Sequence, residues 1–420
     1  MPTDASGRVL PPAHGREPRL PALGEFASLW TLDPEVTFLN HGSFGACPAA
    51  VLRAQGEWRA RLERQPILFL GREVEGLLDE ARAVLARFLG AAAEDIGFVP
   101  NATAGVNTVL RSLTFREGDE LLVTDHEYNA CRNALDFVAS RAGAKVVVAP
   151  IPFPLKSARQ VEEAVLSRVG ERTRLLLIDH VTSPTGLVLP VAPIVRDLER
   201  RGIRCLIDGA HAPGMLPLDL GELGASYYTG NCHKWLCAPK GAGFLHVRRG
   251  LQPEIRPLAI SHGANSTRRD RSLFLLEFGW TGTFDPTPFL GVAESIRQLG
   301  SLLPGGWPEL MRRNRALALE GRGLLCRTLA VPSPSPEEMI GSLASVPLPE
   351  GDAAAVLPPL FIDPLQDALL DRYRIEVPIT LWPAPPHRFV RISAQLYNHV
   401  EQYEYLAEAL QTLLEESRRG

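Results

Sequence analysis

The chain has 420 residues, of which 45% are hydrophobic and 22% are charged, and its formal net charge is −4 at pH 7. This length exceeds one compact core and predicts a large and a small domain. The mild negative charge and the lack of a long basic run argue against a nucleic-acid partner, and no apolar run reaches the roughly 18 residues that cross a membrane.

The predicted elements begin with a short apolar strand and a polar, glycine-containing turn at residues 40–45. Helices are expected from Pro48 to about Arg64 and from Glu73 to Leu89, where apolar residues recur at helical spacing and Gly90 supplies the stop. Strands and helices then alternate. The predicted strands are 96–99, 120–124, 145–149, 174–179, 204–208 and 243–247, and the predicted helices begin at Asn101 and cover 128–141, 161–169 and 191–201.

This alternation of nearly continuous apolar strands with helices predicts an α/β fold, with a mostly parallel sheet covered on both faces. Ligands of such sheets bind beyond the carboxyl ends of the strands, so the polar residues that follow each strand should converge there. Later helices, at 291–299, 308–329 and 400–416, are separated by proline-rich stretches. We expect a flexible arm (1–20), a large ligand-binding domain (21–290) whose first residues could pack on the small domain, and a small α+β domain (291–420).

The six cysteines are scattered and form no CxxC pair and no zinc-like spacing. This pattern predicts free thiols in a reducing compartment. The first 19 residues are rich in proline, glycine and charge and lack the apolar segment of a secretory signal. We therefore expect a cytoplasmic protein.

Lysine is scarce, with four lysines against forty arginines. Arginine meets the general needs of a surface cation, but it cannot lose its proton near neutral pH and attack a carbonyl carbon. Lys234 lies between His233 and Trp235 in a loop of small residues. This setting indicates that Lys234 holds an aldehyde cofactor as a Schiff base; the alternative is a surface lysine in a turn.

Polar residues follow two earlier strands. Thr103 and Ala104 lie at the start of a helix, where free N–H groups favour an anion such as phosphate, although threonine is also a common helix cap. His126 and Tyr128 follow the strand at 120–124 and offer planar rings that could cover one face of a cofactor. An ordinary hydrogen-bonded histidine is the alternative.

Asp208 ends an apolar strand and is followed by small residues, so its carboxylate should face the ligand. A pyridine-type cofactor needs a carboxylate beside its ring nitrogen, because a protonated ring withdraws electrons from a carbanion. A helix-capping aspartate is the alternative, but Asp208 and Lys234 follow consecutive strands and can reach the same cofactor. Arg391, in a late strand, can bind a substrate carboxylate through two parallel hydrogen bonds.

Together these residues resemble the class V aminotransferase family of fold-type I enzymes that use pyridoxal 5'-phosphate (PLP), over about residues 35–400. The chain is most similar to the isopenicillin N epimerase-like branch. The segments that carry the likeness are 39–45, 125–128, 180–186 and 228–235. The resemblance implies a large PLP-binding domain with a mostly parallel seven-stranded sheet, a smaller α+β domain, PLP as cofactor, no metal, and a homodimer.

The resemblance also implies roles for single residues. Lys234 would form the Schiff base and move the proton at Cα, Asp208 would pair with the ring nitrogen, and His211 would lie near the ring hydroxyl. His126 matches the ring-stacking position, with Tyr128 as a rival. The residues implied for the phosphate are Thr103, Ala104, Asn231, His233 and Thr283 of the second subunit. The residues implied for the substrate are Asn40, His41, Ser183 and Arg391, the last for its carboxylate.

The sequence differs from the cysteine desulfurases of this family in one respect that argues against desulfurase chemistry. Cysteine desulfurases carry a nucleophilic cysteine shortly before the carboxylate-binding arginine, but segment 376–388 contains none. The sequence predicts an enzyme acting at Cα of an amino-acid-like substrate, most like an isopenicillin N epimerase-type epimerase or racemase. Epimerisation needs a second acid, for which Tyr128, His41 and His233 are candidates. A C–S lyase and an aminotransferase use the same carbanion and are the alternatives.

Overall fold

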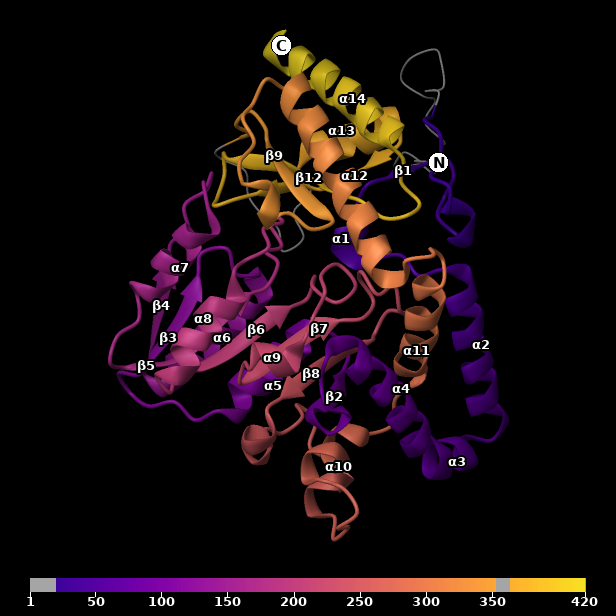
Figure 1. The fold of residues 1–420 in the computed structure, drawn as a ribbon, viewed down its shortest axis with the longest axis vertical. Helices are drawn as coiled ribbons and strands as arrows, with labels where there is room; N and C mark the ends of the chain where they lie inside the picture. The colour runs from indigo at the N-terminus through magenta and orange to yellow at the C-terminus, as the bar shows by residue number, and fades with distance from the viewer. Residues whose placement is uncertain (1–19, 353–362, 420) are drawn as a thin grey trace, which may run out of the picture.

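The computed structural model describes residues 20–352 and 363–419 of the chain. The predicted N-terminal arm, residues 1–20, lies outside the described residues except for Leu20. The described chain forms a larger part built around one sheet and a smaller part that contains the C-terminus, with a long helix running between them (Figure 1).

A seven-stranded sheet forms the centre of the larger part, with strand order β2-β8-β7-β6-β5-β3-β4. All neighbouring strands pair in parallel except that β8 runs antiparallel to both β2 and β7. The strands are β2 (Ile96–Val99), β3 (Glu120–Thr124), β4 (Lys145–Ala149), β5 (Thr173–Asp179), β6 (Arg204–Gly209), β7 (Tyr227–Asn231) and β8 (Gly243–Val247). The predicted mostly parallel seven-stranded sheet is confirmed.

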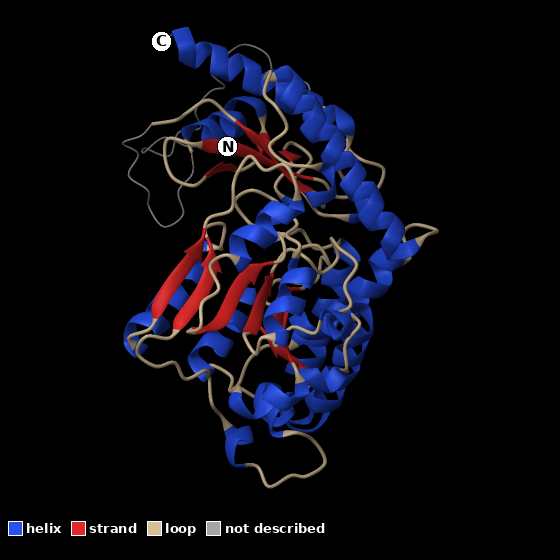
Figure 2. Ribbon diagram, turned by 60° about the vertical axis from the view of Figure 1, so that its left-hand side comes forward, coloured by secondary structure: helices blue, strands red, loops and turns tan. Residues whose placement is uncertain are grey.

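Helices cover both faces of this sheet (Figures 1 and 2). The helices on one face are α5 (Ala102–Ser112), α6 (Asn129–Ala142) and α10 (Leu273–Gly279), and those on the other are α4 (Val74–Leu89), α7 (Ala158–Leu166), α8 (Val191–Arg200) and α11 (Thr287–Gly300). Helix α8 illustrates why: its residues Val191, Ile194, Val195 and Leu198 recur on one side and are all buried. The remaining helices of this part are α1 (His41–Phe44), α2 (Ala49–Arg64), α3 (Pro66–Leu68) and α9 (Leu220–Leu223).

The smaller part contains an antiparallel sheet of order β11-β12-β9 with its own hydrophobic core. Its elements are α12 (Gly306–Thr328), β9 (Leu343–Pro347), α13 (Pro364–Tyr373), β10 (Ile375–Glu376), β11 (Ile379–Leu381), β12 (Arg388–Ser393) and α14 (Val400–Arg419). The short strand β1 (Thr37–Phe38) pairs in parallel with β10, so the chain just before the larger part contacts the smaller one. The domain bounds 21–290 and 291–420 stay a prediction.

Several elements escape the sequence patterns, among them β7, α10, β9 and α13. Strand β7 was not among the predicted strands, because its second half, Thr229, Gly230 and Asn231, is polar or small although it is buried in the sheet. Helix α10 was also not predicted. Helix α7 begins and ends three residues earlier than the predicted helix 161–169. The other boundaries agree with the predictions to within a few residues.

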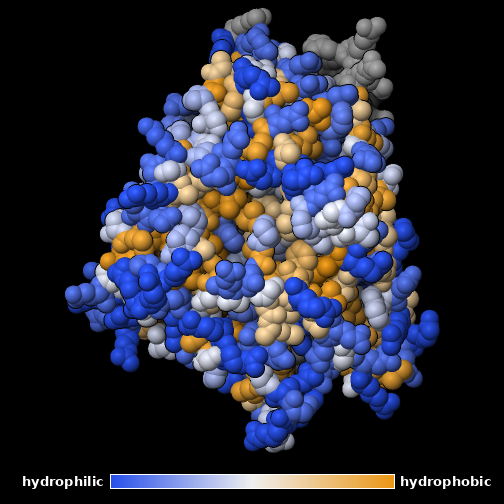
Figure 3. Space-filling view, in the orientation of Figure 1, coloured by the Kyte–Doolittle hydropathy of each residue, from blue (hydrophilic) through white to orange (hydrophobic). Residues whose placement is uncertain are grey.

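The six cysteines are all unpaired. Figure 3 shows a largely polar face, on which hydrophobic residues gather mainly in the middle. No helix among the described residues is long and apolar enough to span a membrane.

Candidate active site

Lys234 lies in the loop just beyond the carboxyl end of β7, and its side chain is largely buried. Its Nζ lies 3.1 Å from Nε2 of His211. Burial and, to a smaller extent, the positive charge of Arg391 lower the pKa of Lys234 from 10.5 to about 7, and the negative charge of Asp208 partly opposes both. Near neutral pH a large fraction of Lys234 is therefore the uncharged, nucleophilic amine.

His211 contacts both Lys234 and Trp235, whose Nε1 donates to His211 Nδ1 over 3.3 Å. An indole nitrogen can only donate, so Nδ1 accepts and the neutral ring carries its hydrogen on Nε2. Burial and the charge of Lys234 keep the pKa of His211 well below 6.5. The Nε2–H group therefore faces the lysine amine and favours its uncharged form.

Asp208 lies at the carboxyl end of β6 and is buried. Its Oδ1 accepts a hydrogen bond from the Ala210 backbone N–H (2.9 Å), and its Oδ2 accepts one from the Cys131 thiol (3.1 Å). Burial raises the pKa of Asp208, while these two hydrogen bonds and Lys234 act in the opposite direction. Asp208 is thus held in place by two donors beside the lysine.

Arg391, on β12, is buried although it carries a guanidinium group. It donates to the carbonyl and the hydroxyl of Ser183, the latter over 3.2 Å, and to the hydroxyl of Ser43 over 3.0 Å. Its Nε has no hydrogen-bond partner among the described residues, and no carboxylate of these residues pairs with it. Burial lowers the pKa of Arg391 to about 10. A buried cation without a protein counter-ion indicates a site for an anionic ligand group.

His126 and Tyr128 differ in their surroundings. His126 is buried, its Nδ1 lies 2.8 Å from Thr185 Oγ1, and its Nε2 has no hydrogen-bond partner within residues 20–352 and 363–419. Burial lowers its pKa to about 3, so the ring is neutral. The ring centroid lies 4.0 Å from that of Trp382. Tyr128 is 44% exposed, and this contrast favours His126 as the ring that covers a flat ligand.

The start of α5 approaches the end of β7. Asn231 Oδ1 accepts from the Ala102 N–H (2.8 Å), and Asn101 Oδ1 accepts from the Ala104 N–H (2.9 Å). Thr103 is partly exposed at this helix terminus. His233 Nδ1 lies 3.1 Å from the Ala242 carbonyl, and burial lowers its pKa to about 4. The predicted phosphate residues Thr103, Ala104 and Asn231 therefore meet at a helix N-terminus, which attracts anions.

Three further residues predicted for the site, His41, Asn40 and Thr283, form no hydrogen bond with the side chain of Lys234, Asp208 or Arg391 in the described structure. His41 is buried between Tyr397 (2.8 Å to its hydroxyl) and the backbone carbonyl of Lys234 (3.0 Å), and its pKa is lowered to about 3 by burial. Asn40 donates to Glu376 and accepts from Ser43, so it contacts the Ser43 hydroxyl that holds Arg391. Thr283 is exposed, and no hydrogen bond among the described residues includes it.

The structure also brings Glu127, Cys131 and Asp179 to the site, none of which the sequence indicated as functional. Strands β5 and β6 pair so that Asp179 lies beside Asp208. The sequence did contain a sign of this contact, because the successive strands predicted at 174–179 and 204–208 both end in aspartate. Glu127 and Cys131 approach from the start of α6, and sequence spacing alone does not show this contact.

Comparison with known proteins gives a consistent result. The family Aminotransferase class-V matches residues 48–273. The chain is 37% identical to an isopenicillin N epimerase of Streptomyces clavuligerus, over 91% of this chain and 96% of that protein. It is 31% identical to a probable chloroplastic L-cysteine desulfhydrase of Arabidopsis thaliana, over 91% of this chain and 84% of that protein.

Among solved structures, the cystine C–S lyase C-DES superposes with a TM-score of 0.73 at 23% identity, over 90% of this chain and 98% of that one. Another C-DES structure carries glycine covalently linked to PLP. At this identity the likeness shows the shared fold. The chain belongs to the class V aminotransferase family of fold-type I enzymes, and its cofactor is pyridoxal 5'-phosphate.

Proposed function

We propose that the protein removes and returns the Cα proton of an amino-acid-like substrate, with epimerisation or racemisation as the outcome. The observation that carries this proposal is the pairing of Lys234, largely uncharged near neutral pH, with the buried guanidinium of Arg391. Arg391 is close enough to lower the pKa of Lys234, and it lacks a carboxylate partner among the described residues. The carboxylate of an amino acid would supply that partner.

The residues around Lys234 fit PLP. His126 Nε2, Asp179 Oδ2 and Arg391 Nε are buried polar atoms without hydrogen-bond partners in the described chain, which is unusual unless a ligand completes the site. The lysine amine suits an aldehyde, Asp208 suits a protonated ring nitrogen, and the α5 N-terminus suits a phosphate. When bound, PLP supplies an electron sink that makes the Cα proton of an attached amino acid acidic. The residues proposed to hold it are Thr103, Ala104, His126, Asp208, His211, Asn231, His233 and Lys234.

Three side chains of the protein bind the substrate and move its Cα proton in this proposal. Arg391, fixed by Ser183 and Ser43, binds and orients the substrate carboxylate. Lys234 takes the proton from Cα and can return it, because its pKa of about 7 lies near the operating pH. His211 keeps the lysine amine directed toward the site.

Epimerisation also requires an acid on the opposite side of Cα. Among the three candidates, both ring nitrogens of His41 are engaged, and His233 Nδ1 contacts a backbone carbonyl. The Tyr128 hydroxyl forms no hydrogen bond with the described residues, and burial raises its pKa while the nearby charge of Arg391 opposes this shift, so the hydroxyl keeps its proton near neutral pH. We assign Tyr128 as the second acid.

A C–S lyase is the second candidate, and the likeness to the Arabidopsis thaliana desulfhydrase supports it. Segment 376–388, which lacks the cysteine of desulfurases, contains Trp382, and this side chain packs on His126 instead. Persulfide transfer by the desulfurase route therefore has no nucleophile in this segment. An elimination that releases sulfide needs no such cysteine.

Incubation of the purified enzyme with amino acids in deuterium oxide separates these functions. We expect deuterium at Cα together with inversion of configuration, measured by NMR and chiral chromatography. A keto acid with sulfide or ammonia would identify a lyase, and accumulation of pyridoxamine phosphate would identify an aminotransferase. Failure of all α-amino acids to exchange the Cα proton would contradict the proposal.

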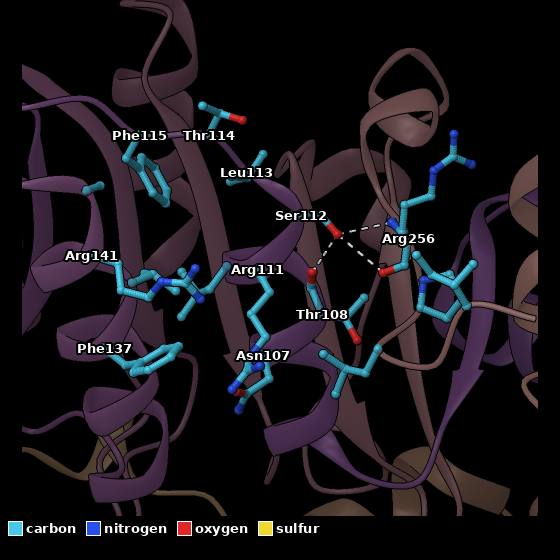
Figure 4. A pocket seen from close by; sticks show the side chains of 16 residues that line it. Asn107, Thr108, Arg111, Ser112, Leu113, Thr114, Phe115, Phe137, Arg141 and Arg256 are labelled. Carbon is cyan, nitrogen blue, oxygen red and sulfur yellow. Dashed lines mark hydrogen bonds between the residues drawn. The ribbon is translucent and has the colours of Figure 1, made fainter.

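We further propose a cytoplasmic homodimer in which Thr283 reaches the phosphate of the neighbouring subunit. A groove of about 900 Å³ lies between α5, α6 and the segment after β8 (Figure 4). Its lining includes Leu258 and Ile260, which are 52% and 67% exposed, on the segment that leads toward Thr283. These exposed apolar side chains favour a second copy of the chain as the occupant of the groove.

Replacing Ile260 with aspartate is expected to weaken the dimer by at least about tenfold, because a charge would be buried at the interface. Light scattering at several protein concentrations measures the change, and PLP affinity should fall with it. Ile67→Asp is the matched control, since Ile67 is 77% exposed and lies outside the groove on α3. Equal dimer dissociation constants for the two variants would contradict this interface.

A further inference from the structure

Three carboxyl groups and a thiol form a buried acid cluster behind Lys234. We define it as Glu127, Cys131, Asp179 and Asp208. One oxygen each of Glu127 and Asp208 and the Cys131 sulfur all lie within 4.8 Å of one another. Asp179 is the direct neighbour of Asp208 in the paired strands β5 and β6. The three carboxyl groups come from different parts of the chain, Glu127 from just before α6, Asp179 from β5 and Asp208 from β6, so the fold itself brings them together.

The members of the cluster differ in their hydrogen bonds. Both oxygens of Asp208 accept, one from Ala210 N–H and one from Cys131. Both oxygens of Glu127 are buried without a partner among the described residues, and so is Oδ2 of Asp179. Glu127 is only 9% exposed. An ionised carboxylate in such a position would lose its hydration without compensation.

The charges that face the cluster do not balance three carboxylates. Lys234 acts on Asp179 and Asp208, and Arg132, on α6, acts on Glu127. Arg132 is also paired with Asp136 at the surface, with 3.0 Å between Nε and Oδ1. Carboxylates this close together cannot all ionise, so at least one proton is shared.

Burial and the charges of Asp179 and Asp208 raise the pKa of Glu127 well above 4.5. Asp208 has two donors that stabilise its ionised form, whereas among the described residues only the Tyr128 backbone N–H acts in this way on Glu127, outweighed by burial. The proton therefore belongs on Glu127, with Asp208 as the acceptor. Burial and the charge of Asp208 raise the pKa of Asp179 as well, but Lys234 and two backbone N–H groups oppose this shift. Tyr128 and Cys131 have raised pKa values and stay neutral.

We propose that Glu127 is a positioning residue that is protonated at neutral pH and donates a hydrogen bond to Asp208, keeping Asp208 ionised and aimed at the ring nitrogen of PLP. This inference rests on the proposed role of Asp208. A protonated carboxyl group has one O–H donor, so it can bind an ionised neighbour that a second carboxylate would repel.

Infrared spectroscopy of the PLP-free protein tests the proton directly. At pH 7 we expect a protonated-carboxyl C=O band that shifts in deuterium oxide and is missing from Glu127→Gln. Asp136→Asn, which removes an exposed acid from the same helix, should retain the band. Identical bands in the wild type and Glu127→Gln would overturn the proposal. A stoichiometric bound metal in the purified protein would also overturn it, because the cluster would then be ionised.

The pH dependence of thermal unfolding gives a second test. Between the unfolded pKa of glutamate, about 4.3, and the raised folded pKa, the folded state holds one proton more than the unfolded state. Stability in this range therefore falls as pH rises. The melting temperature of the PLP-free wild type should decline relative to that of Glu127→Gln as the pH rises above about 5. Parallel curves would count against a protonated Glu127.

The affinity for PLP, measured by fluorescence titration of the PLP-free protein, tests the positioning role. Glu127→Gln keeps a neutral donor and should bind PLP within about threefold of the wild type, whereas Glu127→Ala should bind about tenfold more weakly. Equal losses in both variants would contradict the role. If Asp208→Ala leaves the affinity unchanged, the assignment of Asp208 fails, while the infrared band still decides the protonation of Glu127.

Discussion

Replacing Lys234 with alanine is expected to lower turnover of every substrate by at least about 10⁴-fold, because the site loses both its covalent attachment point and its base. Borohydride reduction of the wild type with PLP should label the peptide that contains Lys234, and mass spectrometry should find no label in Lys234→Ala. The yield of wild-type labelling should rise with pH through a midpoint near 7, since burial lowers the pKa of this amine to about 7.

Lys240→Ala is the matched control. Lys240 lies six positions along the same loop, but its Nζ donates to the Gly45 carbonyl and its side chain takes no part in the proposed chemistry. This variant should keep the label on Lys234 and retain turnover. Label on Lys240, or turnover in Lys234→Ala, would refute the assignment. Lys234→Arg distinguishes charge from nucleophilicity, because arginine keeps the charge but cannot attack an aldehyde.

The sequence predicts the part of the site that lies on strand ends. Asp208 and Lys234 follow neighbouring strands, and the carboxyl ends of parallel strands meet at one edge. The predicted strands therefore place Asp208 and the helix that begins after Asn101 at this edge, whereas Lys234 was placed there from its motif, because β7 was not itself a predicted strand. The mostly parallel sheet is predictable for the same reason, because its strands are nearly continuous apolar runs.

What the sequence could not predict depends on contacts between distant segments. Trp382 packs on His126 although the two belong to different parts of the molecule. Glu127 and Tyr128 are adjacent in the chain, yet the first is buried in the acid cluster and the second is half exposed. Which of the two side chains faces inward depends on how α6 packs against β3 and β4. His41 likewise looked available for substrate, but its ring is enclosed between Tyr397 and the Lys234 backbone.

Replacing Arg391 with alanine is expected to lower kcat/KM for an amino acid by about 10² to 10⁴-fold, which corresponds to the loss of two hydrogen bonds to a charged group. Most of the effect should appear as a higher KM. Arg391→Lys should recover only part of the loss, because an ammonium group cannot form two parallel hydrogen bonds with a carboxylate. Steady-state kinetics with the preferred substrate measures both values.

A substrate analogue without the carboxylate provides the control for Arg391. The corresponding primary amine should react at similar rates with the wild type and with Arg391→Ala, since the lost contact involves the carboxylate only. A second readout needs no substrate: Arg391 lowers the pKa of Lys234, so the midpoint of PLP labelling should move to higher pH in Arg391→Ala. An unchanged midpoint, with equal losses for the amine and the amino acid, would place Arg391 outside the substrate site. The expected pattern would show that one buried guanidinium both recruits the carboxylate and keeps the neighbouring lysine reactive.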